Sequence, residues 1–156
     1  MNLFFYLITY LIRRMKKQQI LLDDEGKFKS RLLDACKEKN YSMVKSEYKY
    51  ASIDFIVINL ENLKSVYMEH KKKNINGNNF DSFMINKCKI DSCKKDFKKC
   101  IFIWDCLDDV YWIYYNKELH QSRLEEIYGS DVYFINKKLV NVGFDSLIES
   151  INKVIK

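Results

Sequence analysis

Apolar and polar residues alternate along much of this chain in patterns typical of β-strands. Two such runs, residues 51–58 and 66–71, are separated by a short polar break. Strand side chains point to opposite faces of a sheet with a period of two. We therefore expect two adjacent strands that pair antiparallel through the connection at residues 59–65.

Helical spacing of apolar residues occurs in four other parts of the chain. The acidic cluster at residues 23–25 suits a helix start, and the following periodicity predicts a helix that ends near Lys39 and is capped by Asn40. Residues 90–99 predict a helix with a basic outer face, and residues 119–128 a short helix closed at Gly129. The clearest amphipathic helix covers residues 144–156.

The remaining strand-like segments complete a mixed pattern. Residues 101–104 and 110–115 are rich in β-branched and aromatic side chains and predict a hairpin whose aromatic rings lie in the core. Weaker extended segments cover residues 41–50, 83–85 and 132–142. The mixture predicts an α/β (α+β) fold with a central mixed sheet flanked by helices, in a single domain over residues 1–156.

Three ionisable residues interrupt the two principal strands. Acidic side chains are depleted in strands, so Asp54 in the first run and Glu69 at the end of the second need an explanation. Glu69 and Lys71 fall on one face of their strand, with His70 opposite. Antiparallel pairing would bring Asp54 near them. Mg²⁺ prefers one or two carboxylates with water and substrate phosphate, and a lysine beside such a site can hold water or stabilise charge on the phosphate.

Asp54, with Glu69-His70-Lys71 about fifteen residues later, resembles the motif of the PD-(D/E)xK restriction-endonuclease-like nucleases, which include Holliday-junction resolvases. The resemblance covers roughly residues 24–115 and implies a core of helix, three strands, helix and strand. It implies that Asp54 and Glu69 bind Mg²⁺ or Mn²⁺, that the backbone carbonyl of His70 is a further ligand, and that Lys71 is the catalytic lysine.

Two features depart from this family pattern. Many members carry a glutamate in the first helix, and the corresponding position here falls near Lys29. Glu25 lies about one turn earlier, Glu38 lies at the other end of the helix, and Glu47 is the best candidate outside it, so the third acidic ligand stays open. The chain also has no proline. A purely structural interpretation, with Asp54 at a strand end and residues 69–73 as a solvated charge run, stays open as well.

The net charge indicates the class of binding partner, and the cysteines indicate the cellular compartment. A formal charge of +6 fits a polyanion such as nucleic acid, most simply DNA. We expect Lys72, Lys73 and Lys89 to contact it. Five cysteines form no Cys-x-x-Cys pair and no even set, which favours free thiols in a reducing, intracellular compartment, the cytoplasm or nucleus, over a secreted protein. The lysine-, asparagine- and isoleucine-rich composition is typical of AT-rich sources, large DNA viruses among them.

The N-terminal residues 1–22 contain an apolar stretch that ends in a basic cluster at residues 13–17. The stretch is shorter than the about twenty residues of a membrane span, and its charges follow it, unlike those of a secretory signal. We expect a helix that covers the sheet or a partner subunit in a homodimer; an interfacial membrane anchor is the alternative. Residues 24–115 would then form the nuclease core, and residues 116–156 a C-terminal extension with its own helix.

Three functions follow from these observations. The first is a metal-dependent endonuclease that hydrolyses phosphodiester bonds in DNA, with Asp54, Glu69 and Lys71 at its site. The second is a catalytically inactive nucleic-acid-binding or assembly module with the same fold. The third is a membrane-associated protein attached through the N-terminal segment.

Overall fold

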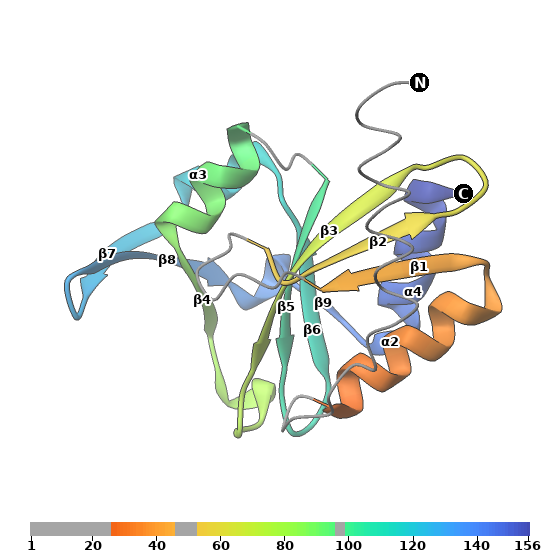
Figure 1. The fold of residues 1–156 in the computed structure, drawn as a ribbon. Helices are drawn as coiled ribbons and strands as arrows, with labels where there is room; N and C mark the ends of the chain where they lie inside the picture. The colour runs from red at the N-terminus through yellow and green to blue at the C-terminus, as the bar shows by residue number, and fades with distance from the viewer. Residues whose placement is uncertain (1–25, 46–52, 96–98) are drawn as a thin grey trace.

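A computed structural model describes residues 26–45, 53–95 and 99–156, which build two β-sheets and three α-helices (Figure 1). The central sheet has six strands in the order β1 (Tyr41–Lys45), β2 (Phe55–Asn59), β3 (Ser65–Lys72), β5 (Cys100–Asp105), β6 (Val110–Tyr114) and β9 (Asn141–Val142). The second sheet has three strands in the order β4 (Ser82–Asn86), β8 (Ser130–Asn136) and β7 (Arg123–Ile127). The helices are α2 (Gly26–Glu38), α3 (Lys87–Lys95) and α4 (Phe144–Ile155), and short 3₁₀ turns cover η1 (Gly77–Asn79), η2 (Lys117–Gln121) and η3 (Lys137–Leu139).

The central sheet is mixed, as the sequence predicted. Strands β2 and β3 pair antiparallel with Phe55 opposite Met68 and Val57 opposite Val66. Strands β5 and β6 form the expected antiparallel hairpin. Strand β3 pairs parallel with β5, and α3, which lies between them in the chain, provides part of the crossover that parallel pairing requires. The α+β assignment is confirmed.

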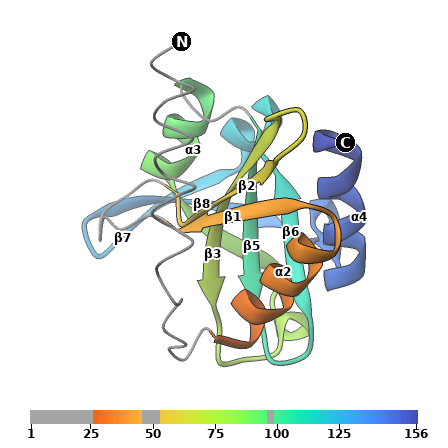
Figure 2. The same ribbon diagram turned by 45° about the vertical axis from the view of Figure 1, so that its right-hand side comes forward.

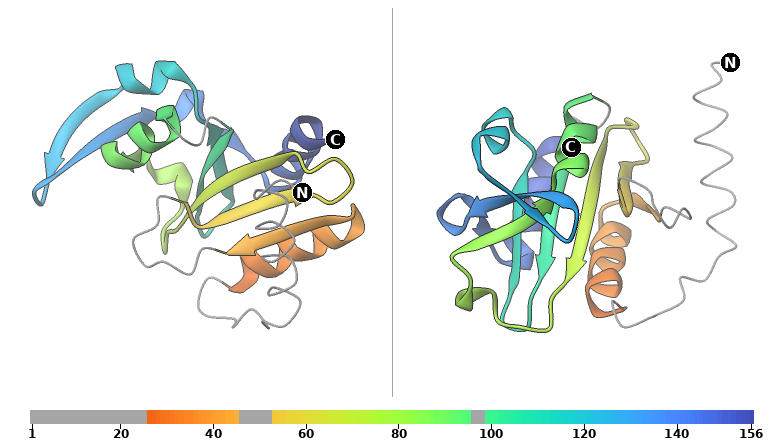
Figure 3. Two further views of the ribbon diagram at one scale, coloured as in Figure 1. Left: turned by 45° about the horizontal axis from the view of Figure 1, so that its top comes forward. Right: turned by 90° about the vertical axis from the view of Figure 1, so that its left-hand side faces the viewer.

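Two apolar cores lie on opposite faces of the central sheet. Helices α2 and α4 cover one face, where Leu32 and Leu147 pack against Val57, Met68 and Ile103. Helix α3 and the second sheet cover the other face (Figure 3). The buried residues of that second core come from α3, both sheets and η2 and include Phe83, Ile85, Ile90, Phe102, Trp104, Tyr111, Leu119 and Ile135. Because each core uses alternate residues of the same strands, the period-two pattern decided which side chains meet which helices.

The sequence prediction was wrong for residues 119–128. The chain forms η2 and then strand β7, which pairs antiparallel with β8 in a hairpin that extends away from the central sheet (Figure 2). Tyr128 and Gly129 both have positive φ, 50° and 80°, the backbone of a two-residue hairpin turn. All residues of β7 except Ile127 are exposed, so no buried stripe supported a helix. The sequence feature that indicates this hairpin is the glycine at Tyr128-Gly129, which is followed by the apolar alternation of β8.

The observed boundaries of the other helices agree more closely with the sequence prediction. Helix α2 ends at Glu38, and Asn40 has the left-handed φ of 57° expected of a cap. Helix α3 begins earlier than predicted, at Lys87, and is described as far as Lys95. The aromatic residues of β6 are core residues, as expected, since Tyr111 and Trp112 are 3% and 5% exposed.

Several expectations fall outside the described residues. These are the N-terminal helix within residues 1–22, the basic cluster at residues 13–17, and the candidate ligands Glu25 and Glu47. Among the helices that the structure describes, none is both long and apolar enough to cross a membrane.

Candidate active site

Asp54 lies in the bend immediately before β2, and two hydrogen bonds tie it to β3. Its backbone N–H donates to the Met68 carbonyl at 2.9 Å, and its Oδ2 accepts from the backbone N–H of His70 at 2.8 Å. These bonds continue the β2–β3 pairing beyond Phe55. They hold the Asp54 carboxylate beside the middle residue of the Glu69-His70-Lys71 motif.

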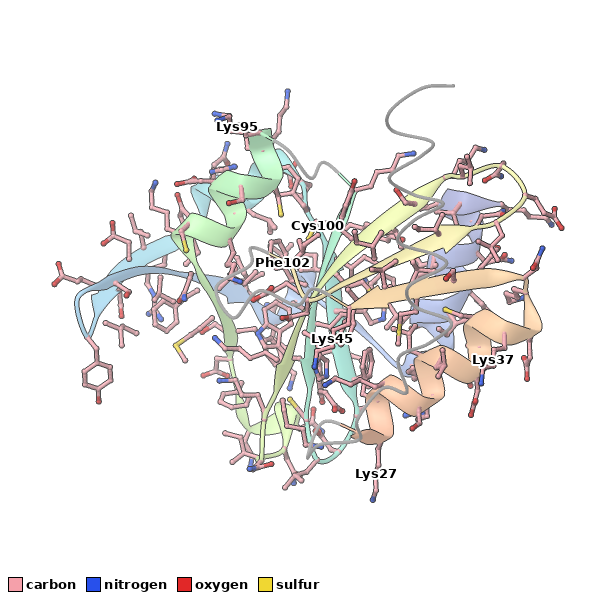
Figure 4. The ribbon with its side chains drawn as sticks, viewed as in Figure 1. Lys27, Lys37, Lys45, Lys95, Cys100 and Phe102 are labelled. Atoms are coloured by element: carbon pink, nitrogen blue, oxygen red, sulfur yellow. The ribbon has the colours of Figure 1, made fainter. Side chains whose placement is uncertain are left out.

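The side chains of β3 alternate between the two faces of the sheet as expected. Glu69 and Lys71 lie next to Phe102 and Trp104 of β5, on the face that α3 and β4 cover. Phe102 is labelled in Figure 4, near the middle of the molecule. The His70 ring points the other way and stacks on Phe28 of α2, with 4.5 Å between ring centroids and 15° between planes. His70 therefore offers the site its backbone and not its imidazole.

Helix α3 contributes a further charge to this face. Lys89 Nζ lies 3.0 Å from Glu69 Oε1, and each side chain is about one-fifth exposed, 22% and 21%. A small cavity of about 30 Å³ is lined by Glu69, Lys71, Lys89 and Asn86, together with apolar residues of β4 and β5. The sequence placed Lys89 near the site, but nothing in it marked Asn86.

The electrostatics of the site reflect two carboxylates held close together. Burial, and then the neighbouring Asp54 carboxylate, raise the pKa of Glu69 to about 7 against the opposing effect of Lys89. Glu69 Oε2 is buried without a hydrogen-bond donor. A buried carboxylate oxygen that faces a second carboxylate is stabilised by a proton or a cation.

Lys71 is the third charged group of the motif. Burial lowers the pKa of its ammonium, and Lys73 and Lys89 lower it further, while Glu69 opposes them. The side chain still reaches the surface. Its amine therefore lies where it can meet a phosphate group without being committed to a buried ion pair.

The residues present fit a divalent cation of the magnesium type. Asp54 and Glu69 supply carboxylate oxygens, the unpartnered Glu69 Oε2 among them, and the carbonyl of His70 is adjacent in the chain. In the described ranges no group of three or more His, Cys, Asp or Glu residues is placed to hold a metal ion. One or two carboxylates completed by water and substrate phosphate is how Mg²⁺ is usually bound in such sites.

Other predicted residues lie apart from this constellation. Lys72 points to the opposite face, 3.6 Å from Asp105, so its contact with nucleic acid stays a prediction and would lie away from Glu69. Lys73 lines a larger groove on the same face as Lys71. Glu38 is exposed at the C-terminal end of α2, nine residues and therefore about 13 Å along the helix axis from Lys29.

Lys29 lies near the helix position where the family pattern is expected to have a glutamate. It is 1% exposed and its Nζ lies 5.9 Å from the centre of the Phe55 ring. Lys27 and Lys37 of the same helix point outward into solvent (Figure 4). In the described part of α2 the buried charged group is therefore an ammonium, while the carboxylates Asp34 and Glu38 are exposed.

Comparison with known proteins identifies the fold. No family model and no curated protein matches the chain. The structure of D212, a nuclease from a fusselovirus, is similar over 96% of this chain and 90% of that one, with a TM-score of 0.53 and 11% sequence identity. A Holliday junction resolvase, Hjc, from Archaeoglobus fulgidus is similar over 70% of this chain and 88% of that one, with a TM-score of 0.44 and 9% identity.

This chain has the restriction-endonuclease-like fold. At 11% identity the similarity to D212 concerns the fold and not the chemistry of individual residues. The fold predicted from the Asp54 and Glu69-His70-Lys71 motif is confirmed. The roles of these residues rest on the geometry described above.

Proposed function

We propose that this protein is a metal-dependent endonuclease that hydrolyses phosphodiester bonds in DNA, with Mg²⁺ or Mn²⁺ as its cofactor. The observation that carries the proposal is the pairing of Asp54 with Glu69, whose buried Oε2 lacks a donor, on the same face as Lys71. Two adjacent carboxylates, one of which has a pKa raised to about 7 by burial and by the other, are typical of functional sites.

Each residue of the site would have a separate role in hydrolysis. Asp54 and Glu69 would hold the metal, which when bound would supply positive charge to the phosphate and acidify water near it. His70 fixes the Asp54 carboxylate through its N–H. Lys71 donates hydrogen bonds to a phosphate oxygen as negative charge develops there. The water oxygen forms its bond to phosphorus and gives up a proton to solvent, while the bond from phosphorus to one ester oxygen breaks and that oxygen takes up a proton from solvent.

The basic surroundings support nucleic acid as the substrate. The chain carries 27 Lys and Arg residues against 21 Asp and Glu residues, and Lys71 and Lys73 follow Glu69 at alternate positions, about 6.7 Å apart along an extended chain. Contacts of this kind hold the phosphate backbone without reading its sequence. The similar structure of D212, a nuclease, agrees with this class of substrate.

A specific observation also favours the second candidate, a nucleic-acid-binding module without cleavage. Lys89 pairs with Glu69 at 3.0 Å, and buried Lys29 lies near the position where the family has its helix glutamate. A cation beside Glu69 weakens a metal site there relative to an all-carboxylate arrangement, and the buried charge of α2 adds no carboxylate ligand. The two candidates differ in one outcome, cleavage in the presence of a divalent metal.

The deciding experiment is cleavage of supercoiled plasmid and of branched DNA with Mg²⁺ or Mn²⁺, for wild type, Asp54→Asn and Glu69→Gln. Glu126→Gln, an exposed position on β7, is the matched control. Cleavage that is lost in both site variants and kept in the control supports the nuclease. Intact DNA with every metal, despite salt-sensitive binding, would select the binding module.

A further inference from the structure

A second and much larger groove adjoins the candidate active site. Its volume is about 910 Å³, at the upper end of the range for ligand-binding pockets. It lies between the second sheet, the segment that follows η1, and η2. Its lining includes Lys73, Phe80, Met84, Trp104, Arg123 and Phe134.

The groove adjoins the small cavity beside Glu69, and the two share lining residues. Met84 and Trp104 line both the groove and the small cavity beside Glu69. The Trp104 indole N–H donates to the Met84 carbonyl at 3.2 Å, and the Phe83 ring packs 4.8 Å from the indole. Trp104 and Met84, which separate the two spaces, are therefore held in place. A nucleic-acid strand that runs from Glu69 past Lys71 would reach the groove at Lys73.

Two partly exposed aromatic rings face this space. Phe80 and Phe134 both line the groove and are only partly buried. The Arg123 guanidinium lies over the Phe134 ring, 4.4 Å from its centre, which holds a flat, cationic surface beside the ring. Aromatic rings together with arginine planes are the surfaces on which unpaired bases stack.

The charges in the groove favour a base over a phosphate. Lys73 and Arg123 are balanced by Asp81 and Glu118, and the polar remainder includes amides such as Gln121 and Asn136. Base edges present both donors and acceptors, which such a mixed lining can satisfy. A chain of phosphates alone would gain little from a groove with no excess positive charge.

We infer that this groove binds unpaired nucleotides of the strand that enters the carboxylate site, with bases stacked on Phe80 and Phe134. The inference rests on the proposed function for the direction of the strand. It names the substrate class: nucleic acid with a single-stranded segment next to the bond that is cut. In a duplex the base faces are covered by stacking and the Watson–Crick edges are paired, so neither is available to the groove.

The test is fluorescence anisotropy of a labelled oligothymidine and of a blunt DNA duplex, in EDTA and at fixed salt. The variants are Phe134→Leu and Phe80→Leu, which keep an apolar side chain but remove the ring, and Arg123→Ala, which removes the exposed guanidinium over Phe134. Tyr128→Leu is the matched control, because Tyr128 is a fully exposed aromatic residue outside the groove. We expect each Phe variant to weaken oligothymidine binding by at least about fivefold and to leave duplex binding unchanged, with Phe134→Tyr close to wild type.

Two results would overturn the inference: oligothymidine affinity equal to wild type in both Leu variants and in Arg123→Ala, or an equal loss for oligothymidine and duplex. Because EDTA removes the need for cleavage, the outcome is separate from that of the proposed function. If the Phe variants lose the oligothymidine selectively while no DNA is cut with any metal, the groove stands and the nuclease proposal fails.

Discussion

The Asp54 carboxylate accepts a hydrogen bond from the backbone N–H of His70 at 2.8 Å. This bond joins the two halves of a motif that are about fifteen residues apart in the chain. It also separates the roles of the residues in β3. The backbone of His70 orients a carboxylate on the active face, while its ring packs on Phe28 on the other face.

Lys71 and Lys72 provide a matched pair of substitutions, since they are adjacent but point to opposite faces. Lys71→Ala should lower DNA cleavage by roughly 10²- to 10³-fold, the loss typical of one donor to a developing negative charge. Lys72→Ala removes an ion pair with Asp105 on the other face and should leave the rate within a few-fold of wild type. Single-turnover cleavage rates measure both. Equal losses in the two variants would place the catalytic role elsewhere.

Lys89 competes with a cation for Glu69. Replacing it with methionine should increase Mn²⁺ affinity by a factor of roughly 2 to 5, the value of a partly exposed ion pair. Titration calorimetry measures this without any cleavage. The control is Lys138→Met, an exposed lysine of η3. A decrease in affinity would instead mean that Lys89 orients the carboxylate for the metal.

Glu69 should make the metal-free protein less stable as the pH rises. Its folded pKa of about 7 lies above the ordinary value of 4.5, so the folded state retains a proton that the unfolded chain releases. The free energy of unfolding therefore falls between pH 4.5 and 7 and levels off above that range. Denaturant unfolding in EDTA should show this slope in wild type and a smaller one in Glu69→Gln. An unchanged slope in that variant would contradict the raised pKa.

Asp108 should have the opposite effect at acid pH. Despite a raising effect of burial, bonds donated by the Gly77 N–H, the Tyr111 hydroxyl and the Asn78 N–H lower the pKa of Asp108 to about 2. Its contribution is complete above the ordinary value of 3.8 and is lost as the pH falls toward 2.

Asp108→Asn should consequently be less stable than wild type at neutral pH. The difference in free energy of unfolding should shrink between about pH 4 and pH 2. Asp131→Asn, an exposed position at the start of β8, is the control. A difference that stays constant over this pH range would show that the carboxylate charge is irrelevant to these bonds.

Gly77 has no room for a side chain. A Cβ built there would lie 2.1 Å from Cε2 of Tyr111, and Tyr111 is 3% exposed in the second core. Gly77→Ala should lower the free energy of unfolding by about 1–3 kcal/mol, the usual cost of overpacking. Thermal unfolding measures it, and a Tyr111→Leu background should reduce the loss. An equal loss in both backgrounds would mean that the ring is not the obstacle.

The sequence alone determined the local features of the site, and only the tertiary structure decided its surroundings. Alternation placed Glu69 and Lys71 on one face with His70 opposite, because strand geometry fixes side-chain direction residue by residue. The parallel pairing of β3 with β5, the contact of Lys89 with Glu69, and the groove beside Trp104 join segments far apart in the chain, and no local period encodes such contacts. Residues 119–128 show the same limit: their spacing fitted a helix, and pairing with β8 made Arg123–Ile127 a strand.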